Sequence, residues 1–246
     1  MNNFEQLDDY LSGRKFDNSL AIKWKFDNML ISRIDYLSEI CKGKNIIHLG
    51  CLDHNLDTIT RKIASNTWLH KRLTDVSARC LGIDIDPLLI DKIKDMGINN
   101  VICSDLSADH LITEITSCQW DYLVCGELIE HIDNPVSFLS TIKDKYASYI
   151  KNIIVTVPNS LNFSYIKKSF KTLEAINTDH RYSFTPYNIS KILVISGYRP
   201  VRTDMVMHFD PKTRGVLHRL IFKKFPLLRS DIIVEAEFPP LGKILN

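Results

Sequence analysis

Short apolar runs alternate with longer helical patterns along this chain, and this alternation limits the fold more than any other feature. Gly or Asp bounds each apolar run, and about 10 to 15 residues with helical periodicity follow it. Such an order is typical of βαβ units, which build a parallel sheet with helices on both faces. We therefore predict a single α/β domain with a Rossmann-like, doubly wound sheet.

The expected strands comprise five that alternate with helices and two at the end of the chain. They span residues 45–49, 79–84, 100–104, 121–125, 152–157, 199–207 and 231–237. The helices between them include residues 87–96, 135–147 and 186–197. Pro87 and Pro135, each directly after Asp or Asn, suit first helical turns, where proline needs no amide partner. The pattern predicts a seven-stranded mixed sheet whose last strand is antiparallel.

The region before the first strand has a helical spacing of apolar residues. Over residues 20–41, apolar side chains recur at steps of three and four, at Ile22, Phe26, Met29, Leu30, Ile34 and Leu37. We predict an N-terminal helical cover over residues 1–43. The main domain then spans residues 44–246 and holds a basic helical insertion at about 210–229.

Composition and charge are those of an ordinary soluble protein. Of the 246 residues, 45% are hydrophobic, and 31 Lys and Arg stand against 29 Asp and Glu. This balance lacks the basic footprint of nucleic-acid binders, so we do not favour a nucleic-acid partner. The six cysteines occur singly, and no stretch reaches the ~20 apolar residues of a membrane span. With no secretory signal at the start, we expect a cytoplasmic protein, either in solution or at the inner face of the membrane.

Polar residues or glycine end the first four expected strands, where a doubly wound sheet binds its ligands. Gly50 ends the first strand, Asp84 the second, Asp105 the third, and Glu127 follows the fourth. A carboxylate at Asp84 can accept both hydroxyls of a ribose, and one at Asp105 can accept an adenine amino hydrogen. The alternative is that both acids only cap the helices that follow them.

The four segments that contain these residues resemble the successive motifs of class I S-adenosylmethionine-dependent methyltransferases, and the resemblance covers roughly residues 44–200. They are residues 46–50, 82–86, 104–105 and 120–127. The resemblance implies S-adenosylmethionine as the cofactor. It assigns cofactor contacts to Gly50, Cys51, His54, Asp84, Ile85, Asp105, Leu106 and Glu127.

The loop after the first strand departs from the family pattern. That loop usually has several glycines, which let the backbone approach the cofactor, whereas residues 50–55 contain only Gly50. Together with residues 68–72, this loop resembles a variant found in methyltransferases of bacterial surface-polysaccharide gene clusters. The variant implies a sugar hydroxyl as the acceptor. It places His54 and His70 at the cofactor's carboxylate or beside the acceptor, although both histidines also suit surface or capping positions.

Acids and histidines gather after the fourth strand. Glu127, Glu130 and His131 are spaced so that one helical turn projects all three from one face, and His180 precedes a helix at the same edge. His131 and His180 are candidate bases for the acceptor's proton. The four side chains also match ligands of Mg²⁺ or Mn²⁺ and resemble the metal site of small-RNA 2′-O-methyltransferases. The same pattern occurs in methyltransferases without metal, so we do not favour a bound ion, and a bracing role for Glu130 and His131 stays open.

Further residues are candidates for acceptor binding. Asn159 follows the fifth strand and can orient the acceptor or bond the loop backbone, Tyr182 can form an apolar wall, and His70 belongs to the variant loop. Residues 213–225 alternate apolar and basic side chains. Such a helix can lie on an anionic membrane, bind a phosphorylated or acidic acceptor, or pack its apolar face on the sheet.

Three functions follow from these features. The first is O-methylation of a sugar hydroxyl in bacterial surface-polysaccharide assembly, with a glycan acceptor that is free, nucleotide-linked or lipid-linked. The second is metal-dependent 2′-O-methylation of RNA, favoured by Glu127, Glu130, His131 and His180 but opposed by the near-neutral net charge. The third is a non-catalytic relative that binds a partner through residues 213–225.

Overall fold

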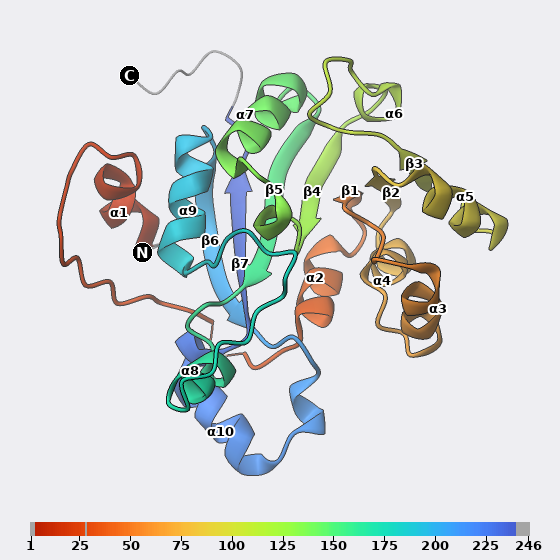
Figure 1. The fold of residues 1–246 in the computed structure, drawn as a ribbon. Coiled ribbons are helices and arrows are strands. Elements are labelled where there is room, and N and C mark those ends of the chain that lie inside the picture. Colours follow the sequence, from red (N-terminus) through yellow and green to blue (C-terminus); the bar gives the residue numbers. More distant parts are fainter. Residues whose placement is uncertain (1–2, 28, 240–246) are drawn as a thin grey trace.

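A twisted seven-stranded sheet forms the centre of the computed structural model, which describes residues 3–27 and 29–239 (Figure 1). In the order β3-β2-β1-β4-β5-β7-β6, β7 runs in the direction opposite to the other six strands. The strands are β1 (Asn45–Leu49), β2 (Arg79–Asp84), β3 (Val101–Cys103), β4 (Trp120–Gly126), β5 (Ile150–Pro158), β6 (Arg199–Val206) and β7 (Asp231–Glu237). The predicted doubly wound mixed sheet is therefore confirmed.

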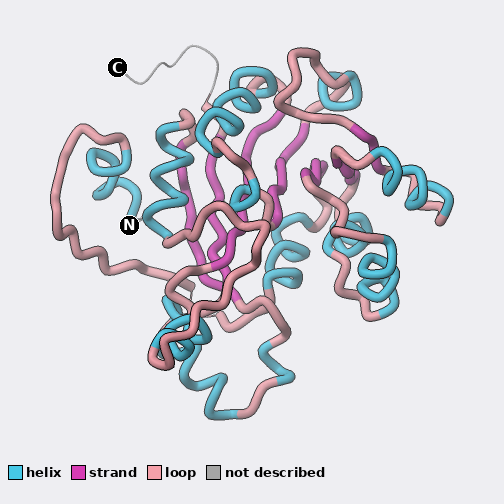
Figure 2. The backbone as a smooth tube through the Cα atoms, in the orientation of Figure 1, coloured by secondary structure: helices cyan, strands magenta, loops and turns pink. Residues whose placement is uncertain are grey.

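Helices cover both faces of the sheet (Figure 2). One face packs against α1 (Asn3–Leu11), α6 (Thr113–Thr116), α7 (Pro135–Tyr146) and α9 (Pro186–Ile195). The other packs against α2 (Arg33–Cys41) and α4 (Leu69–Val76), while α3 (Leu56–Ala64) and α5 (Pro87–Asp95) cover the β3 edge. Two further helices, α8 (Phe163–Ser169) and α10 (Val216–Lys224), lie together at one end of the molecule (Figure 1).

Alternation along the strands divides the core between these two layers. Ile47 and Leu123 point to the layer of α7 and α9, whereas Ile46 and Val124 point to that of α2 and α4. All four side chains are fully buried, which explains why these strands appear in the sequence as continuous apolar runs. None of the described helices combines the length and the apolar character needed to cross a membrane.

The helix starts follow the local sequence signals. Asp86 caps α5 and Asn134 caps α7, each through a side-chain oxygen that accepts a backbone N–H, and a proline follows each cap. The predicted first-turn positions of Pro87 and Pro135 are confirmed. The predicted helix over residues 186–197 is also confirmed as α9, which begins at Pro186 after the cap of Thr185.

The predicted helix over residues 20–41 is wrong for its first half. Only α2 is helical, residues 20–27 and 29–31 are extended, and residue 28 lies outside the described part. Side chains alternate here, with Trp24 stacked on Phe26 at 6.0 Å between their ring centroids and both packed on the core. The segment ends where Ile31 accepts a hydrogen bond from Met207 N–H beside β6. Pairing with Met207, just after β6, thus outweighs the helical spacing. The domain boundary placed after residue 43 stays a prediction.

Candidate active site

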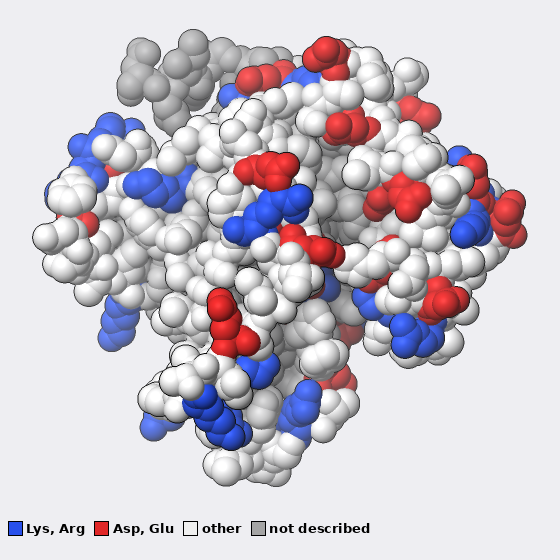
Figure 3. Space-filling model, viewed as in Figure 1, with Lys and Arg blue, Asp and Glu red and all other residues white. Residues whose placement is uncertain are grey.

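A cavity of about 1450 Å³ opens at the carboxyl ends of β1 to β4. Pockets for one small ligand usually measure roughly 300–1,000 Å³, so this cavity has room for a nucleoside cofactor and an acceptor together. Figure 3 shows the face hollowed between its two halves, with charged side chains around the hollow. Its walls include most of the residues predicted from the sequence: Gly50, Cys51, His54, Asp84, Ile85, Asp105, Leu106, Glu127, His131 and His180.

Asp84 holds the loop after β1 and faces the cavity. One carboxylate oxygen accepts Leu52 N–H at 3.0 Å, and the other accepts Ile85 N–H at 2.8 Å. A carboxylate offers about four lone-pair positions, so Asp84 can still accept hydroxyl donors from a ribose. The next side chain, Ile85, is 73% exposed at the cavity wall. An exposed apolar surface beside a carboxylate fits the flat base and the diol of a nucleoside.

Backbone conformation shapes the loop that would lie against the cofactor. Gly50 has φ of 68°, and an added Cβ there would lie 3.2 Å from Leu128 Cδ1. Glycine relieves both the left-handed strain and this close contact. The single glycine that the sequence retains in this loop is therefore at the position where the backbone requires one.

Asp105 is partly engaged by its own loop. Its Oδ1 accepts the Ser107 N–H at 2.8 Å and the Ser107 hydroxyl at 2.6 Å. The neighbouring Leu106 is buried yet contributes to the cavity wall. Asp105 thus braces its own turn and does not cap the next helix, α6, whose cap position is Ile112. It lines the same cavity as Asp84.

His70 does not reach the cavity, contrary to its predicted role in acceptor binding. Its side chain is 0% exposed and stacks on His48, with 3.4 Å between their Nδ1 atoms. Burial lowers the pKa of both histidines, that of His70 to about 4. A Cβ added to Gly82 would lie 2.6 Å from the His70 ring. His70 is therefore a neutral packing residue under β1 and β2, and only His48 of the pair touches the cavity wall.

Glu127 belongs to a balanced cluster of charges at the base of the cavity. It has φ of 55°, and its carboxylate lies 3.4 Å from Arg33 and 3.7 Å from His208. Asp231, at the start of β7, lies 3.4 Å from His208 and 3.9 Å from Arg33. Burial alone would raise the pKa of Glu127, but Arg33 and His208 outweigh it and lower the pKa to about 2. Hydrogen bonding to Asp231 and then to Glu127 raises the pKa of His208 to about 9.

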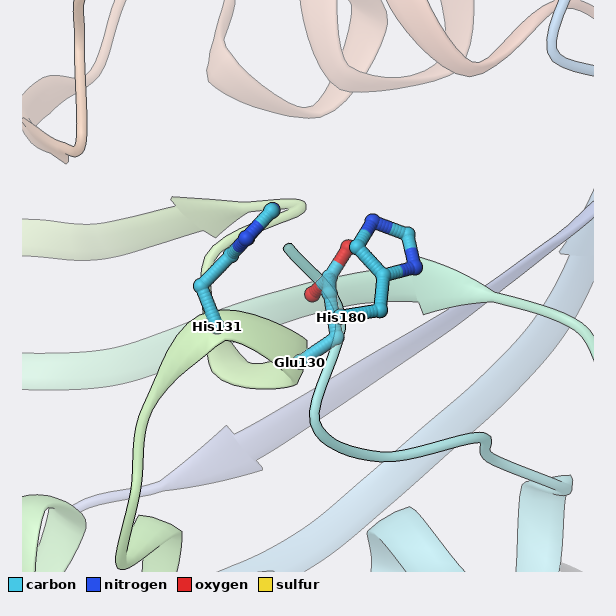
Figure 4. Close-up of side chains that lie close together, drawn as sticks. All are labelled: Glu130, His131 and His180. Carbon is cyan, nitrogen blue, oxygen red and sulfur yellow. The ribbon is translucent and has the colours of Figure 1, made fainter. Parts of the chain in front are cut away.

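Glu130, His131 and His180 form a second cluster at the cavity wall. One ligand atom from each lies within 4.8 Å of the others, and the two imidazoles meet edge to face at 4.7 Å between centroids (Figure 4). Both oxygens of Glu130 are buried without a hydrogen-bond partner among the described residues. Burial raises the pKa of Glu130 to about 8, while burial and then His131 lower the pKa of His180. At neutral pH the cluster therefore holds a protonated carboxyl group and a neutral His180.

The loop that carries His180 is fastened to the turn after β4. Arg181 N–H donates to the Glu130 carbonyl at 2.8 Å, and Arg181 Nη1 donates to the His131 carbonyl at 2.6 Å. The Tyr182 hydroxyl donates to the Asp133 carbonyl at 2.7 Å. Tyr182 thus fixes the loop from outside this cavity, and it lines a smaller second cavity beside α8 instead.

Asn159 is also withdrawn from the cavity. It is fully buried, and its amide nitrogen donates to the carbonyls of Leu227 and Arg229 at 2.9 and 2.7 Å. Its side-chain oxygen accepts Leu161 N–H at 3.0 Å. Of the two roles predicted for Asn159, the geometry supports hydrogen bonding to the loop backbone. It does not support contact with the acceptor.

The buried carboxyl of Glu130 makes stability depend on pH. Its raised pKa means that the folded protein binds a proton that the unfolded chain, with an ordinary glutamate pKa of ~4.3, releases. We expect the free energy of unfolding to fall as pH rises from ~4.3 to about 8, by roughly 5 kcal/mol from this group. Chemical denaturation at several pH values should show that Glu130→Gln removes this fall.

A matched substitution isolates the effect. Glu114 is exposed on α6. The free energies of unfolding of Glu114→Gln and of the wild type should therefore differ by the same amount at every pH. If Glu130→Gln behaves like Glu114→Gln, the carboxyl of Glu130 is ionised in the folded protein and the assignment of its proton is wrong.

Four charged residues of the two clusters and their loop had no predicted role: Arg33, Arg181, His208 and Asp231. Arg33 begins a helix far from the fourth strand in sequence, and His208 follows β6, so only the sheet brings them to Glu127. Arg181 lies beside the predicted His180, and its position next to a site histidine was the available signal.

No family model and no curated protein matches this sequence. Among solved structures, the small RNA methyltransferase HEN1 is 14% identical over 91% of this chain, with a TM-score of 0.54, and the chain spans only 27% of its length. A SAM-dependent methyltransferase from Aquifex aeolicus is 13% identical, covering 85% of this chain and 91% of that one, with a TM-score of 0.50. A chain of the Haloferax volcanii complex between the Trm112 methyltransferase activator and a methyltransferase is 9% identical, covering 83% and 87%, with a TM-score of 0.52. This chain thus has the α/β fold of S-adenosylmethionine-dependent methyltransferases.

Proposed function

We propose that this protein is an S-adenosylmethionine-dependent methyltransferase that acts on the hydroxyl of a sugar. The observation that carries the proposal is one cavity with a nucleoside-type wall at Asp84 and Ile85 and a histidine cluster at His131 and His180. The cavity has room for two ligands, as a group transfer between them requires. The fold places both parts at the carboxyl ends of the strands, where such sheets bind ligands.

The chain's own residues divide the work between binding and proton transfer. The cofactor, when bound, supplies an electrophilic methyl group on sulfonium. Asp84 would accept the ribose hydroxyls, and the ionised Glu127 would attract the cofactor's ammonium group. His180, neutral because its pKa is lowered, would accept the proton that the acceptor hydroxyl loses.

A sugar acceptor in surface-polysaccharide assembly is supported by the sequence of two segments. Residues 50–55 and 68–72 resemble those of methyltransferases from such gene clusters. The buried positions of Trp68 and His70 assign the second segment to packing, so the first segment carries this part of the proposal. Its Gly50, Cys51 and His54 all line the cavity.

Metal-assisted 2′-O-methylation of RNA is the second candidate, favoured by the carboxyl group of Glu130, whose two oxygens have no hydrogen-bond partner among the described residues. With His131 and His180 it offers one oxygen and two nitrogens within 4.8 Å, a ligand set that suits Mg²⁺ or Mn²⁺. A cation there would lower the pKa of an acceptor hydroxyl. The fourth predicted ligand, Glu127, faces Arg33 and His208 instead, which favours the metal-free proposal.

Calorimetric titration with S-adenosylhomocysteine tests the proposal. The protein is purified free of bound ligand, and the titration with S-adenosylhomocysteine is repeated in the presence of Mg²⁺, of Mn²⁺ and of a chelator. Binding that is independent of metal supports the leading proposal. If Mn²⁺ raises the thermal stability of the wild type but not that of Glu130→Gln, the metal-assisted candidate is favoured. No binding at any ligand concentration would contradict both and support a non-catalytic partner-binding protein.

Transfer of a labelled methyl group then separates the acceptors. Nucleotide sugars, lipid-linked glycans and short RNA ends are offered to the same preparation. Label on a glycan that survives chelation supports the leading proposal, whereas label that reaches only the RNA and disappears with chelator replaces it by the second candidate.

A further inference from the structure

Two neighbouring segments expose apolar side chains to solvent at one end of the molecule. We call residues 163–176 and 212–225 together the basic apolar face. Six of its apolar side chains have exposed fractions of 58% to 87%: Phe170, Leu173, Ile176, Val216, Leu217 and Leu220. The expectation that residues 213–225 pack their apolar side on the sheet is therefore wrong for Val216, Leu217 and Leu220, and the buried Phe222 contacts Phe163 of α8.

The two segments form one surface although they are far apart in sequence. Phe163 in α8 contacts Phe222 in α10, with 6.1 Å between ring centroids. Figures 1 and 2 both show α8 beside α10 at the lower end of the view. Their exposed apolar side chains therefore belong to a common patch rather than to two isolated helices.

Basic side chains surround this patch. The basic apolar face holds eight of the 31 Lys and Arg and one of the 29 Asp and Glu, which leaves 23 basic against 28 acidic residues elsewhere. Figure 3 shows Lys and Arg at the lower end of the molecule. The eight are Lys167, Lys168, Lys171, Lys212, Arg214, Arg219, Lys223 and Lys224. A chain with a near-neutral total thus has a strongly positive end.

We propose that the basic apolar face docks onto an anionic lipid bilayer. Lipid headgroups match its positive charge, and the acyl boundary accepts apolar side chains such as Leu217 and Leu220. A second copy of the chain would set two positive faces against each other. Protein interface cores are depleted of lysine. Five of the six exposed apolar side chains are aliphatic, and such side chains gain little from the bases of RNA, which stack on aromatic rings.

The docked orientation has a consequence for the acceptor, which rests on the proposed function. A second cavity of about 280 Å³ lies beside α8, lined by Ile166, Leu173 and Ile176 and reaching His180. His180 also lines the large cavity. An acceptor with a lipid tail would therefore lie with its tail against Ile166, Leu173 and Ile176 of this second cavity and its sugar at the histidine cluster.

Vesicle co-sedimentation of the full chain, without cofactor, tests the docking independently of methyl transfer. Vesicles of phosphatidylcholine alone are compared with vesicles that also contain phosphatidylglycerol. We expect binding to the anionic vesicles only, weakened by added salt. Lys223→Gln/Lys224→Gln should reduce the partition coefficient between vesicles and water about thirtyfold, because each basic residue near the membrane surface contributes ~1 kcal/mol to binding. Leu217→Ser should reduce it about tenfold.

Helix α5 supplies matched controls. Leu88 is 74% exposed against 73% for Leu217, and Lys92 and Lys94 are exposed like the lysines of α10. Leu88→Ser and Lys92→Gln/Lys94→Gln should bind vesicles as the wild type does. Equal losses in the α5 and α10 variants would overturn the proposal, as would equal binding to neutral vesicles or none to either.

Two other occupants give distinct results. If sedimentation equilibrium shows a dimer that Leu217→Ser dissociates, the face is a subunit contact and the proposal is wrong. If a short single-stranded RNA binds the wild type, loses affinity with Lys223→Gln/Lys224→Gln, and vesicles do not bind, the face belongs to RNA and the proposal is also wrong.

Discussion

Asp84→Ala is expected to weaken binding of S-adenosylhomocysteine by a hundredfold or more. Hydrogen bonds to a charged group contribute roughly 1.5–3 kcal/mol each, and a ribose would donate two to this carboxylate. Their loss corresponds to about 3 kcal/mol or more, and each 1.4 kcal/mol is tenfold in affinity. Isothermal titration of both proteins with the same ligand measures the difference directly.

The controls for Asp84 separate binding from folding. Asp84 also accepts Leu52 N–H and Ile85 N–H, so circular dichroism must show that the variant is folded at the titration temperature. Asp86→Ala removes the same charge two residues away, where the carboxylate caps α5. We expect it to lower stability by about 1 kcal/mol and to keep cofactor affinity. Affinity retained by Asp84→Ala would show that the ribose binds elsewhere.

The sheet was predictable because local and long-range signals agree along each strand. The predicted bounds of β1, β2 and β7 match the structure, and the other strands differ only at their ends. These strands are buried on both faces, so burial keeps a continuous apolar run in the sequence. Parallel order also places Gly50, Asp84 and Glu127 at one edge without further information.

The extended segment before α2 shows where two periodicities compete. Ile22, Trp24 and Phe26 alternate with the exposed Lys23 and Lys25, which is the period of a strand. Ile22 and Phe26 also satisfy steps of three and four with later apolar positions, and this longer match favoured a helix. The hydrogen bonds that decide between them come from the region of β6, far along the chain, and no local pattern contains that information.

Side-chain partners were less predictable than side-chain positions. The spacing of Glu127, Glu130 and His131 places them on one turn, but the structure divides them between two clusters. Glu127 turns toward Arg33 and His208 because those cations neutralise it in a buried site. Both partners arrive through strand order, so sequence spacing alone groups Glu127 with the wrong neighbours.

His131→Ala and His180→Ala are each expected to reduce turnover about 10²- to 10⁴-fold, the range for removal of a general base or its partner, with little change in cofactor affinity. Neither side chain lies at the nucleoside-type wall of Asp84 and Ile85. The kinetics use the acceptor that takes the labelled methyl group. His110→Ala, at an exposed loop position, is the matched control and should retain full turnover. A loss of cofactor affinity equal to the loss of turnover would instead assign the histidines a structural role.

The pH profile and the double variant show whether the two histidines act together. If neutral His180 accepts the proton, turnover of the wild type should fall only below its lowered pKa, under the ordinary value of 6.5. Because the rings touch and Arg181 fixes the loop to the His131 carbonyl, each histidine positions the other. Removing both should then cost no more than the larger single loss, whereas additive losses would mean that His131 and His180 contribute separately.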